Sequence, residues 1–338
     1  MDIARQAGVS PQTVSRAIND KGEIRPQTRE RILRIADELG YCPNSIARSL
    51  ATRRTQTVGL VVPDVSNPFF AEVARGIQDA ACGADYQIFL CNSDENVERE
   101  MSAIRSLEAQ RVDGMILCSS RLSDRRLAKL GERYQPLVLV NRRIAGLQAG
   151  CVVIDDARGM EEATRYLLAL GHRHIGLLAG PQNSRSGQER VKGYRRAMRA
   201  YDLDPPPERL IHCPPQVEGG QRAARSLLRR ARELTALLAY NDLVAVGALR
   251  ACIELDLDVP QACAIVGCDD IPLAALVSPP LTTIHVPKYE LGQQAMSLLL
   301  RMIERKEWKP DPVVLAPHLV TRDSAGLPVA QRKGVFYA

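Results

Sequence analysis

Four polar side chains that can hydrogen-bond to flat ligands are closely spaced near the start of the chain. They are Gln12, Thr13, Ser15 and Arg16, in the segment D-I-A-R-Q-A-G-V-S-P-Q-T-V-S-R-A-I-N. An arginine fork fits O6 and N7 of guanine, and a glutamine amide fits adenine or a neighbouring phosphate. The spacing therefore favours a helix that reads bases in a major groove. An ordinary amphipathic helical hairpin is the alternative.

Local signals around these residues predict the elements that present them. Asp2 is suited to start a short helix, and Gly8 is suited to a sharp turn because glycine adopts the left-handed region easily. Ser10 followed by Pro11 is typical of the start of the next helix. A third helix is expected from Arg25 to Leu39 with its apolar side chains inward, at Ile32, Leu33, Ile35, Ala36 and Leu39.

A basic segment with one apolar side chain follows, from Pro43 to Arg54 (P-N-S-I-A-R-S-L-A-T-R-R). Its arginines, Arg48 among them, can face phosphates, and Asn44 or Ser45 can cap a short helix. Leu50 is the kind of side chain that wedges between base pairs in a minor groove, although a buried linker leucine would look the same.

Charge and composition agree with a basic N-terminal module. The chain carries a net charge of +6, and residues 1–55 hold 10 Lys/Arg against 6 Asp/Glu. Nine cysteines occur without a C-x-x-C pair, which favours reduced, buried thiols and a cytoplasmic location. No signal peptide or membrane-length apolar run is evident.

From residue 57 onward, short apolar runs alternate with longer amphipathic segments, including V-G-L-V-V, G-M-I-L-C, L-V-L-V, A-L-L-A-Y and C-A-I-V-G. This pattern predicts an α/β core of two doubly wound parallel sheets. Ligands bind at the carboxyl ends of such strands. Polar and aromatic residues follow the runs there, and candidates to bind a ligand include Asn67, Phe69, Phe70, Asn141, Arg142, Ser184, Arg190, Asn241 and Asp269. Amide and carboxylate groups with aromatic faces suit a sugar.

Two signals for other chemistry are weak. G-H-R-H at 171–174 lacks a third metal ligand and fits a helix end better. Asp269 and Asp270 are adjacent on a strand end, so they point in different directions and do not form an acid/base pair. We see no nucleophile elbow, P-loop or dinucleotide fingerprint, and expect neither an enzyme nor a metal or cofactor.

The motifs A-G-V-S-x-x-T-V-S-R, L-G-Y-x-P-N, A-R-S-L and V-G-L-V-V-P-D-V-S-N-P-F-F resemble the lactose/galactose repressor (LacI/GalR) family of bacterial regulators. The motifs N-P-F-F and C-N-S-D-E-N are most similar to the ribose-repressor branch. The resemblance extends to at least Asp323. It implies an all-α helix-turn-helix headpiece and a core like the periplasmic sugar-binding proteins, with the effector between two lobes.

The resemblance also assigns roles and boundaries. It implies that the effector is contacted by Asn67, Phe70, Asn141, Arg142, Arg190, Asn241 and Asp269. Leu50 matches the hinge leucine, Arg16 and Gln12 match base-reading positions, Tyr41 and Asn44 match phosphate contacts, and Pro11 stands where members vary. The domains implied are 1–42 (headpiece), 43–55 (hinge), 56–155 plus 286–318 (first lobe), 156–285 (second lobe) and 319–338 (tail). A homodimer on an inverted-repeat operator is expected, and no tetramerising helix, because the last twenty residues lack a leucine heptad.

Two departures from the family pattern modify these expectations. Several residues usually precede the D-I-A motif, so we expect weaker operator binding than for a form extended upstream of Met1. Near Pro215 the chain reads C-P-P-Q where relatives often place an aromatic wall, which disfavours a flat purine. A nucleobase-responsive or partner-responsive regulator and a sugar-binding module without a DNA role remain as alternatives. The sequence leaves open the effector, whether it induces or co-represses, and the operator.

Overall fold

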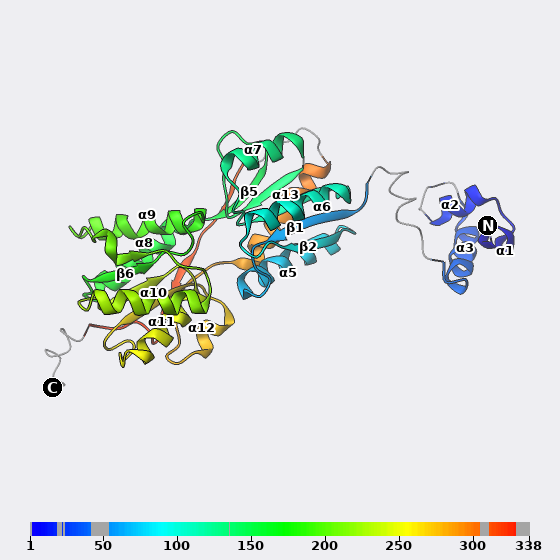
Figure 1. Ribbon diagram of the computed structural model, residues 1–338. Helices are drawn as coiled ribbons and strands as arrows, with labels where there is room; N and C mark the ends of the chain where they lie inside the picture. Colours follow the sequence, from blue (N-terminus) through cyan, green and yellow to red (C-terminus); the bar gives the residue numbers. More distant parts are fainter. Residues whose placement is uncertain are drawn as a thin grey trace. The chain divides into compact units, whose positions relative to one another are not determined.

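The computed structural model describes residues 2–18, 22, 24–41, 54–134, 136–304 and 311–328. The chain divides into two units, Met1–Gln56 and Thr57–Ala338. Figure 1 shows the helices and strands of both units.

The N-terminal unit contains three helices, α1 (Asp2–Ala7), α2 (Pro11–Ile18) and α3 (Pro26–Glu38). The turn between α1 and α2 places Gly8 at φ +62°, and the Ser10 Oγ accepts a hydrogen bond from the Thr13 backbone N–H at 3.2 Å. The turn at Gly8 and the helix cap at Ser10 therefore form where the sequence predicts them. The small core is formed by Ile3, Ala4, Ala7, Val14, Ala17, Ile32, Ile35 and Ala36.

Two inward assignments on α3 were wrong. Leu33 is 41% exposed and Leu39 is 43% exposed. The core-facing stripe of α3 follows Ile32, Ile35 and Ala36, and one residue after Ile32 the helix has already turned by about 100°. Leu39 lies beyond the last helical residue as its C-cap.

The second unit contains two six-stranded sheets, and we call the half built on each sheet a lobe (Figure 1). The sheet of lobe 1 has the strand order β11-β5-β4-β3-β1-β2, and all its pairs are parallel. Its elements are β1 (Thr57–Val62), α5 (Pro68–Cys82), β2 (Gln87–Asn92), α6 (Val97–Ala109), β3 (Gly114–Cys118), α7 (Asp124–Arg133), β4 (Leu137–Val140), β5 (Gly150–Ile154), α13 (Lys288–Glu304) and β11 (Val313–Leu315).

The sheet of lobe 2 has the order β12-β10-β9-β8-β6-β7 and is parallel except for β12, which runs antiparallel to β10. Its elements are α8 (Asp156–Ala169), β6 (Ile175–Leu178), α9 (Arg185–Arg199), the 3-10 helix η1 (Pro207–Arg209), β7 (Leu210–Ile211), α10 (Val217–Arg230), β8 (Ala236–Ala239), α11 (Asp242–Glu254), β9 (Ala264–Asp269), α12 (Pro272–Leu276), β10 (Thr282–His285) and β12 (His318–Val320). The expectation of two doubly wound parallel sheets is confirmed, with β12 as the antiparallel exception.

The start of the C-terminal tail was placed too early. Residues 318–320 form a strand of lobe 2. Ser324 is fully buried and hydrogen-bonds Thr282 and Ile265. The Gly326 carbonyl lies 2.8 Å from Nε2 of His172. A strand this short leaves no periodicity to detect, so the sequence pattern could not reveal it.

Helix pairs that cover the sheets approach closely through glycines. A Cβ built on Gly76 of α5 would lie 2.1 Å from the Tyr289 carbonyl oxygen of α13, and one on Gly292 would lie 2.1 Å from the Val73 carbonyl oxygen. Gly193 and Gly247 are equally close to the backbones of α8 and α10. These helices pack backbone to backbone because their contacting residue has no side chain.

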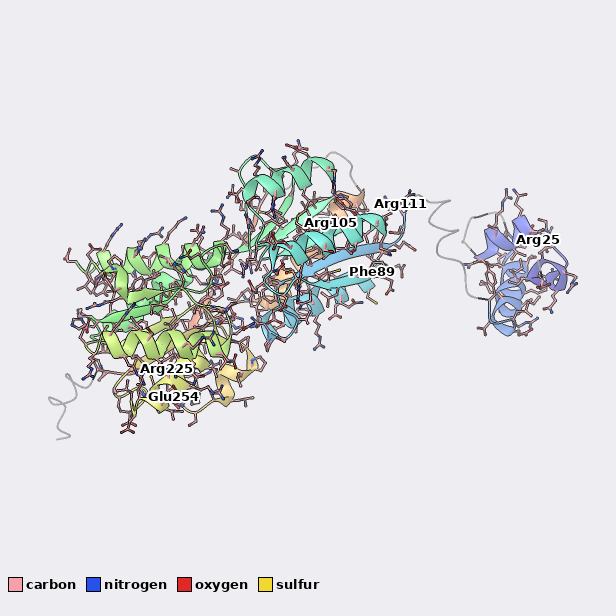
Figure 2. The ribbon with its side chains drawn as sticks, in the orientation of Figure 1. Arg25, Phe89, Arg105, Arg111, Arg225 and Glu254 are labelled. Atoms are coloured by element: carbon pink, nitrogen blue, oxygen red, sulfur yellow. The ribbon has the colours of Figure 1, made fainter. Side chains whose placement is uncertain are left out.

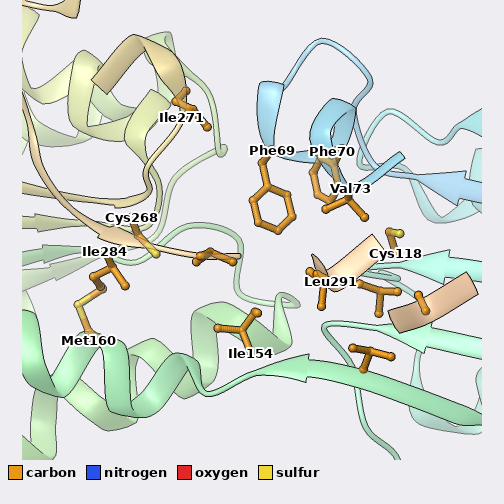
Figure 3. Close-up of a cluster of buried hydrophobic side chains, with 14 of the residues drawn as sticks. Phe69, Phe70, Val73, Cys118, Ile154, Met160, Cys268, Ile271, Ile284 and Leu291 are labelled. Carbon is orange, nitrogen blue, oxygen red and sulfur yellow. The ribbon is translucent and has the colours of Figure 1, made fainter. Parts of the chain in front are cut away.

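The two lobes share one apolar core where the chain crosses between them. The chain crosses after β5, after β10 and after β11. One cluster of buried side chains includes Val73 and Leu291 of lobe 1 together with Met160 and Ile284 of lobe 2 (Figure 3). Phe69, at the start of α5, extends from lobe 1 toward lobe 2 in the same view. The crossover region is thus packed as an interior.

Candidate functional site

Polar residues from the carboxyl ends of strands in both lobes surround one small cavity. Its lining residues are Asn67, Phe69, Phe70, Glu95, Ser119, Arg121, Asn141, Ser186, Arg190, Pro215, Tyr240, Asn241 and Asp269. The cavity volume is about 20 Å³, room for about one water molecule. Small-molecule sites usually measure about 300–1,000 Å³. In this arrangement of the lobes the cavity is therefore too small to hold a small-molecule ligand.

Helix starts position several of these side chains. Asn67 is the N-cap of α5, and its Oδ1 accepts the Phe69 N–H at 3.0 Å. Phe69 and Phe70 follow in the first turn, with ring centroids 5.0 Å apart and an edge-to-face angle of 86°. Asn241 caps α11 in the same way, accepting the Val244 N–H at 2.9 Å. The amides are thereby fixed at the cavity wall, and their remaining hydrogen-bonding capacity is available to a ligand.

Four residues at these strand ends have a left-handed backbone conformation. Glu95, Ser119, Asn141 and Asp269 have φ values of +55°, +46°, +56° and +111°. Non-glycine residues adopt positive φ rarely, and the cost is tolerated mainly where it aims a functional side chain. All four line the cavity, which indicates that it is a binding site.

Arg190 of α9 is the central buried charge of the cavity. Its Nε donates to Asp156 Oδ1 at 2.8 Å, its Nη2 lies 3.6 Å from Asp269 Oδ1, and its Nη1 donates to the Tyr240 carbonyl oxygen. The guanidinium also lies 4.9 Å from the centroid of the Tyr240 ring. Burial raises the pKa of Asp269 to about 6, against the opposing charge of Arg190. Above that pH the site holds a carboxylate able to accept from two hydroxyl groups.

Two sets of contacts join the lobes beside the cavity. Asp124, the first residue of α7 in lobe 1, accepts from Arg142 at 2.8 Å and from Arg185 of lobe 2. Arg142 holds the pKa of Asp124 below its usual range. Lys288 of α13 donates to the carbonyl oxygens of Asp269 and Asp270 at 2.7 and 3.0 Å. Opening the lobes must break or rearrange these contacts.

Asp242, directly after Asn241, is a buried carboxyl beneath the cavity wall. It accepts from Thr283 Oγ1 at 2.5 Å and from the Ile271 N–H at 2.9 Å. Burial raises the pKa of Asp242 to about 8, and the charge of Asp269 adds to the rise. The group is therefore protonated in the folded protein at neutral pH.

We expect Asp242→Asn to stabilise the protein at pH 8 relative to the native chain, and to do so less at pH 5. The unfolded carboxyl ionises near pH 4, whereas the folded carboxyl ionises only near pH 8. Between these values each unit of rising pH costs the native protein up to about 1.4 kcal/mol, a loss that the amide does not suffer. Urea unfolding at both pH values measures this, with the exposed Asp204→Asn as control. An equal loss of stability at both pH values would contradict it.

Seven of the residues predicted to bind a ligand lie at the cavity: Asn67, Phe69, Phe70, Asn141, Arg190, Asn241 and Asp269. Two do not line it. Arg142 turns its guanidinium to the Ser120 carbonyl oxygen and Asp124. Ser184 caps α9 and bonds the Tyr240 hydroxyl at 2.9 Å. Neither residue is among those that line the cavity, and their contact with a ligand stays a prediction.

The predicted set omits three lining residues with strong polar groups, Glu95, Arg121 and Tyr240. Glu95 and Arg121 follow strands in the same way as the predicted residues, so strand position was the available signal. Tyr240 ends the apolar run A-L-L-A-Y, where an aromatic residue reads as core. Pro215, the position noted for its missing aromatic wall, also lines the cavity.

On the N-terminal unit, Pro11, Gln12, Ser15 and Arg16 are exposed on α2, and Thr13 is half-buried beside Ser10. Tyr41 is 47% exposed. The residues with the strongest predicted hinge roles, Asn44, Arg48 and Leu50, lie outside the described residues. The exposed face of α2 has the polar side chains in its first turns that base reading requires.

Other kinds of site find no support among the described residues. In that part of the chain, no His, Cys, Asp or Glu groups are arranged to hold a metal ion. Among the same residues, no helix has the length and apolar character to cross a membrane.

Comparisons with known proteins agree with both units. Residues 1–44 match the model "Bacterial regulatory proteins, lacI family", and residues 55–321 match "Periplasmic binding proteins and sugar binding domain of LacI family". The HTH-type transcriptional regulator RegA of Clostridium saccharobutylicum is 35% identical over 96% of this chain and 98% of its own length.

Solved structures are similar over the same span. The lac repressor dimer bound to operator and the anti-inducer ONPF matches with a TM-score of 0.87 at 27% identity, covering 96% of this chain and 98% of that one. A LacI family regulator from Enterococcus faecium with bound ribose matches with a TM-score of 0.70 at 31% identity, covering 80% and 98%.

Proposed function

The chain belongs to the LacI family of bacterial regulatory proteins, and on that premise we propose that it is an operator-binding repressor controlled by a sugar effector. The helix-turn-helix unit reads the operator, and the cavity between the lobes takes the effector. The proposal is carried by the convergence of strained, polar strand-end residues from both lobes on one cavity. The ribose bound in a similar regulator supports a sugar as its occupant.

Effector control follows from the contacts between the lobes. A ligand in the cavity changes how far the lobes separate, and so changes the contacts of Arg185 with Asp124 and of Lys288 with Asp269. β1 of lobe 1 starts at Thr57, and only Thr55 and Gln56 separate it from the basic segment. A shift of lobe 1 is thereby passed to residues 43–54, whose docking in the minor groove depends on their position. Differential contacts of this kind are what an effector needs in order to shift a two-state equilibrium.

A homodimer is proposed because each lobe exposes large apolar side chains. β2 is the edge strand of its sheet, and its Phe89 and Leu90 are 47% and 49% exposed. Figure 2 labels Phe89 on this strand. Ile253 of α11 and Leu276 of α12 are 74% and 79% exposed. Apolar residues on an unprotected edge favour pairing with a second copy. Two copies place two recognition helices on an inverted repeat.

We expect Arg16→Ala to weaken binding to the cognate operator by about 1–3 kcal/mol and to relax one base position in each half-site. Arg16 is exposed on α2 and outside the core of its unit, so folding is preserved. The operator is first selected from random duplexes, and gel shifts at fixed salt then compare the variant with the exposed Arg5→Ala on α1. We expect the shifted complex to contain two copies of the chain. Equal affinity of wild type and Arg16→Ala for every operator variant would refute base reading by this residue.

A further inference from the structure

The charges that line the cavity are balanced. Its charged side chains are Arg121, Arg190, Glu95 and Asp269, and each guanidinium already has a carboxylate partner. Arg190 has Asp156 in addition, 2.8 Å from its Nε. No cation among the described lining residues is left for an incoming anion.

The Arg121–Glu95 pair is a two-point contact within lobe 1. Arg121 donates from Nε to Glu95 Oε2 at 2.6 Å and from Nη2 to Glu95 Oε1 at 3.1 Å. The Arg121 side chain is 3% exposed and that of Glu95 is 21% exposed. The guanidinium also lies beside Tyr240 of lobe 2. A fork held on both arms by a carboxylate is among the strongest side-chain contacts in proteins, so the carboxylate is costly to displace.

One acceptor atom in the cavity wall has no hydrogen-bond donor opposite it. Asn141 Oδ1 is buried without a hydrogen-bond partner in the described structure, and Asn141 as a whole is 9% exposed. Its Nδ2 reaches Ser119 Oγ at 3.4 Å. A buried acceptor left unpaired costs about 1–3 kcal/mol, which a ligand hydroxyl can recover. The charged group of an acid or phosphate derivative has no proton to donate there, so it cannot satisfy this acceptor.

We propose that the Glu95–Arg121 pair makes this cleft selective for an uncharged polyhydroxyl effector and excludes its acid and phosphate derivatives. The inference rests on the proposed function of the cleft as an effector site. Hydroxyl groups donate to Glu95 and Asn141 and accept from Arg121 without disturbing the charge balance. An anion in the cleft would lie near the carboxylates of Glu95 and Asp269, whose arginine partners are already paired. An uncompensated buried charge is strongly unfavourable.

The decisive variant is Glu95→Gln, which leaves Arg121 with a neutral partner. Calorimetric titration of the full chain at pH 7.5 uses matched sets: D-ribose, D-ribonate and D-ribose 5-phosphate, and D-glucose, D-gluconate and D-glucose 6-phosphate. In the native protein we expect an uncharged member to bind at least about tenfold more tightly than its anions. In Glu95→Gln the uncharged ligand weakens about tenfold and an anion gains about tenfold, because Arg121 has lost its carboxylate partner and can pair with the anion.

Controls separate this outcome from misfolding and from failure of the proposed function. Glu98→Gln makes the same charge change on the exposed surface of α6 and leaves the preference unchanged. If Glu95→Gln does not fold, Arg121→Lys is used, which keeps the charge but loses the two-point contact with Glu95, so the preference for the uncharged ligand should fall. Native protein that prefers an anion or binds no uncharged compound overturns the proposal, as does an unchanged preference in Glu95→Gln. Operator binding is measured separately by gel shift, so its loss counts against the proposed function alone.

Discussion

Arg190→Ala is expected to cost about 3–5 kcal/mol of folding free energy and to abolish stabilisation by any effector. The guanidinium is buried between Asp156 and Asp269, and it also bonds the Tyr240 carbonyl oxygen across the site. Removing one partner of a buried ion pair leaves uncompensated charge, and losses of this size are typical. The effector loses its central donor at the same time.

The loss should also depend on pH. Without Arg190, the largest opposing charge is lost, and only Lys288 and a hydrogen bond from Cys268 still offset the burial that raises the pKa of Asp269 to about 6. A carboxyl with a raised folded pKa contributes most at low pH and loses stability as pH rises. Urea unfolding should therefore show a larger deficit at pH 8 than at pH 5. Arg195→Ala, exposed on the same helix, should change stability by no more than about 0.5 kcal/mol. A pH-independent deficit below 1 kcal/mol for Arg190→Ala would show that the pair contributes little.

Gly292→Ala is expected to destabilise the protein by about 2–3 kcal/mol, although alanine is the better helix former by about 1 kcal/mol. The new Cβ would lie 2.1 Å from the Val73 carbonyl oxygen and 2.9 Å from the Ile77 nitrogen. Both are backbone atoms of α5, so no side chain can rotate away. The helices must separate, which opens the core of lobe 1 at Leu291 and Val73. Overpacked cores typically lose about 1–3 kcal/mol.

Gly83→Ala is the matched control for that substitution. Gly83 ends α5 at φ −62°, and the nearest atoms to its added Cβ are 3.7 Å away. Alanine fits there and restricts the unfolded chain, so its effect should be neutral or slightly stabilising. Denaturation midpoints of the two variants, compared in one buffer, decide the question. Similar midpoints would mean that α5 and α13 can separate at no cost.

The sequence predicted elements where the signals are local. Gly8, Ser10 and Pro11 each fix one turn or cap, and the continuous apolar runs at β1, β3, β4, β8 and β9 identify strands buried on both faces. Leu33 was misassigned because α3 packs on one side only, and a single apolar residue next to the stripe does not reveal its direction. β7, β11 and β12 are two or three residues long, too short for a pattern to emerge.

The order of strands along the chain predicted which residues lie near the site. It did not predict the direction in which each side chain points. Strand ends brought Asn67, Asn241 and Asp269 to one place because all ligand-facing edges of parallel sheets are carboxyl ends. Side-chain direction depends on the backbone turn after each strand, as two arginines of lobe 1 show. Arg121 and Arg142 follow neighbouring strands, yet only Arg121 lines the cavity, and Arg142 turns to the Ser120 carbonyl oxygen. That choice is made by tertiary contacts.

The three crossings between the lobes have a consequence for biosynthesis. The ribosome completes the helix-turn-helix unit within the first 41 residues, but lobe 1 lacks α13 and β11 until residue 315 has been made. Lobe 2 lacks β12 and the buried Ser324 until later still. Neither lobe can close its core during translation of the preceding residues. A chain terminated by a premature stop codon after β10 therefore carries the segment proposed to read DNA with no finished domain to control it, and its exposed sheet edges make it a substrate for proteolysis.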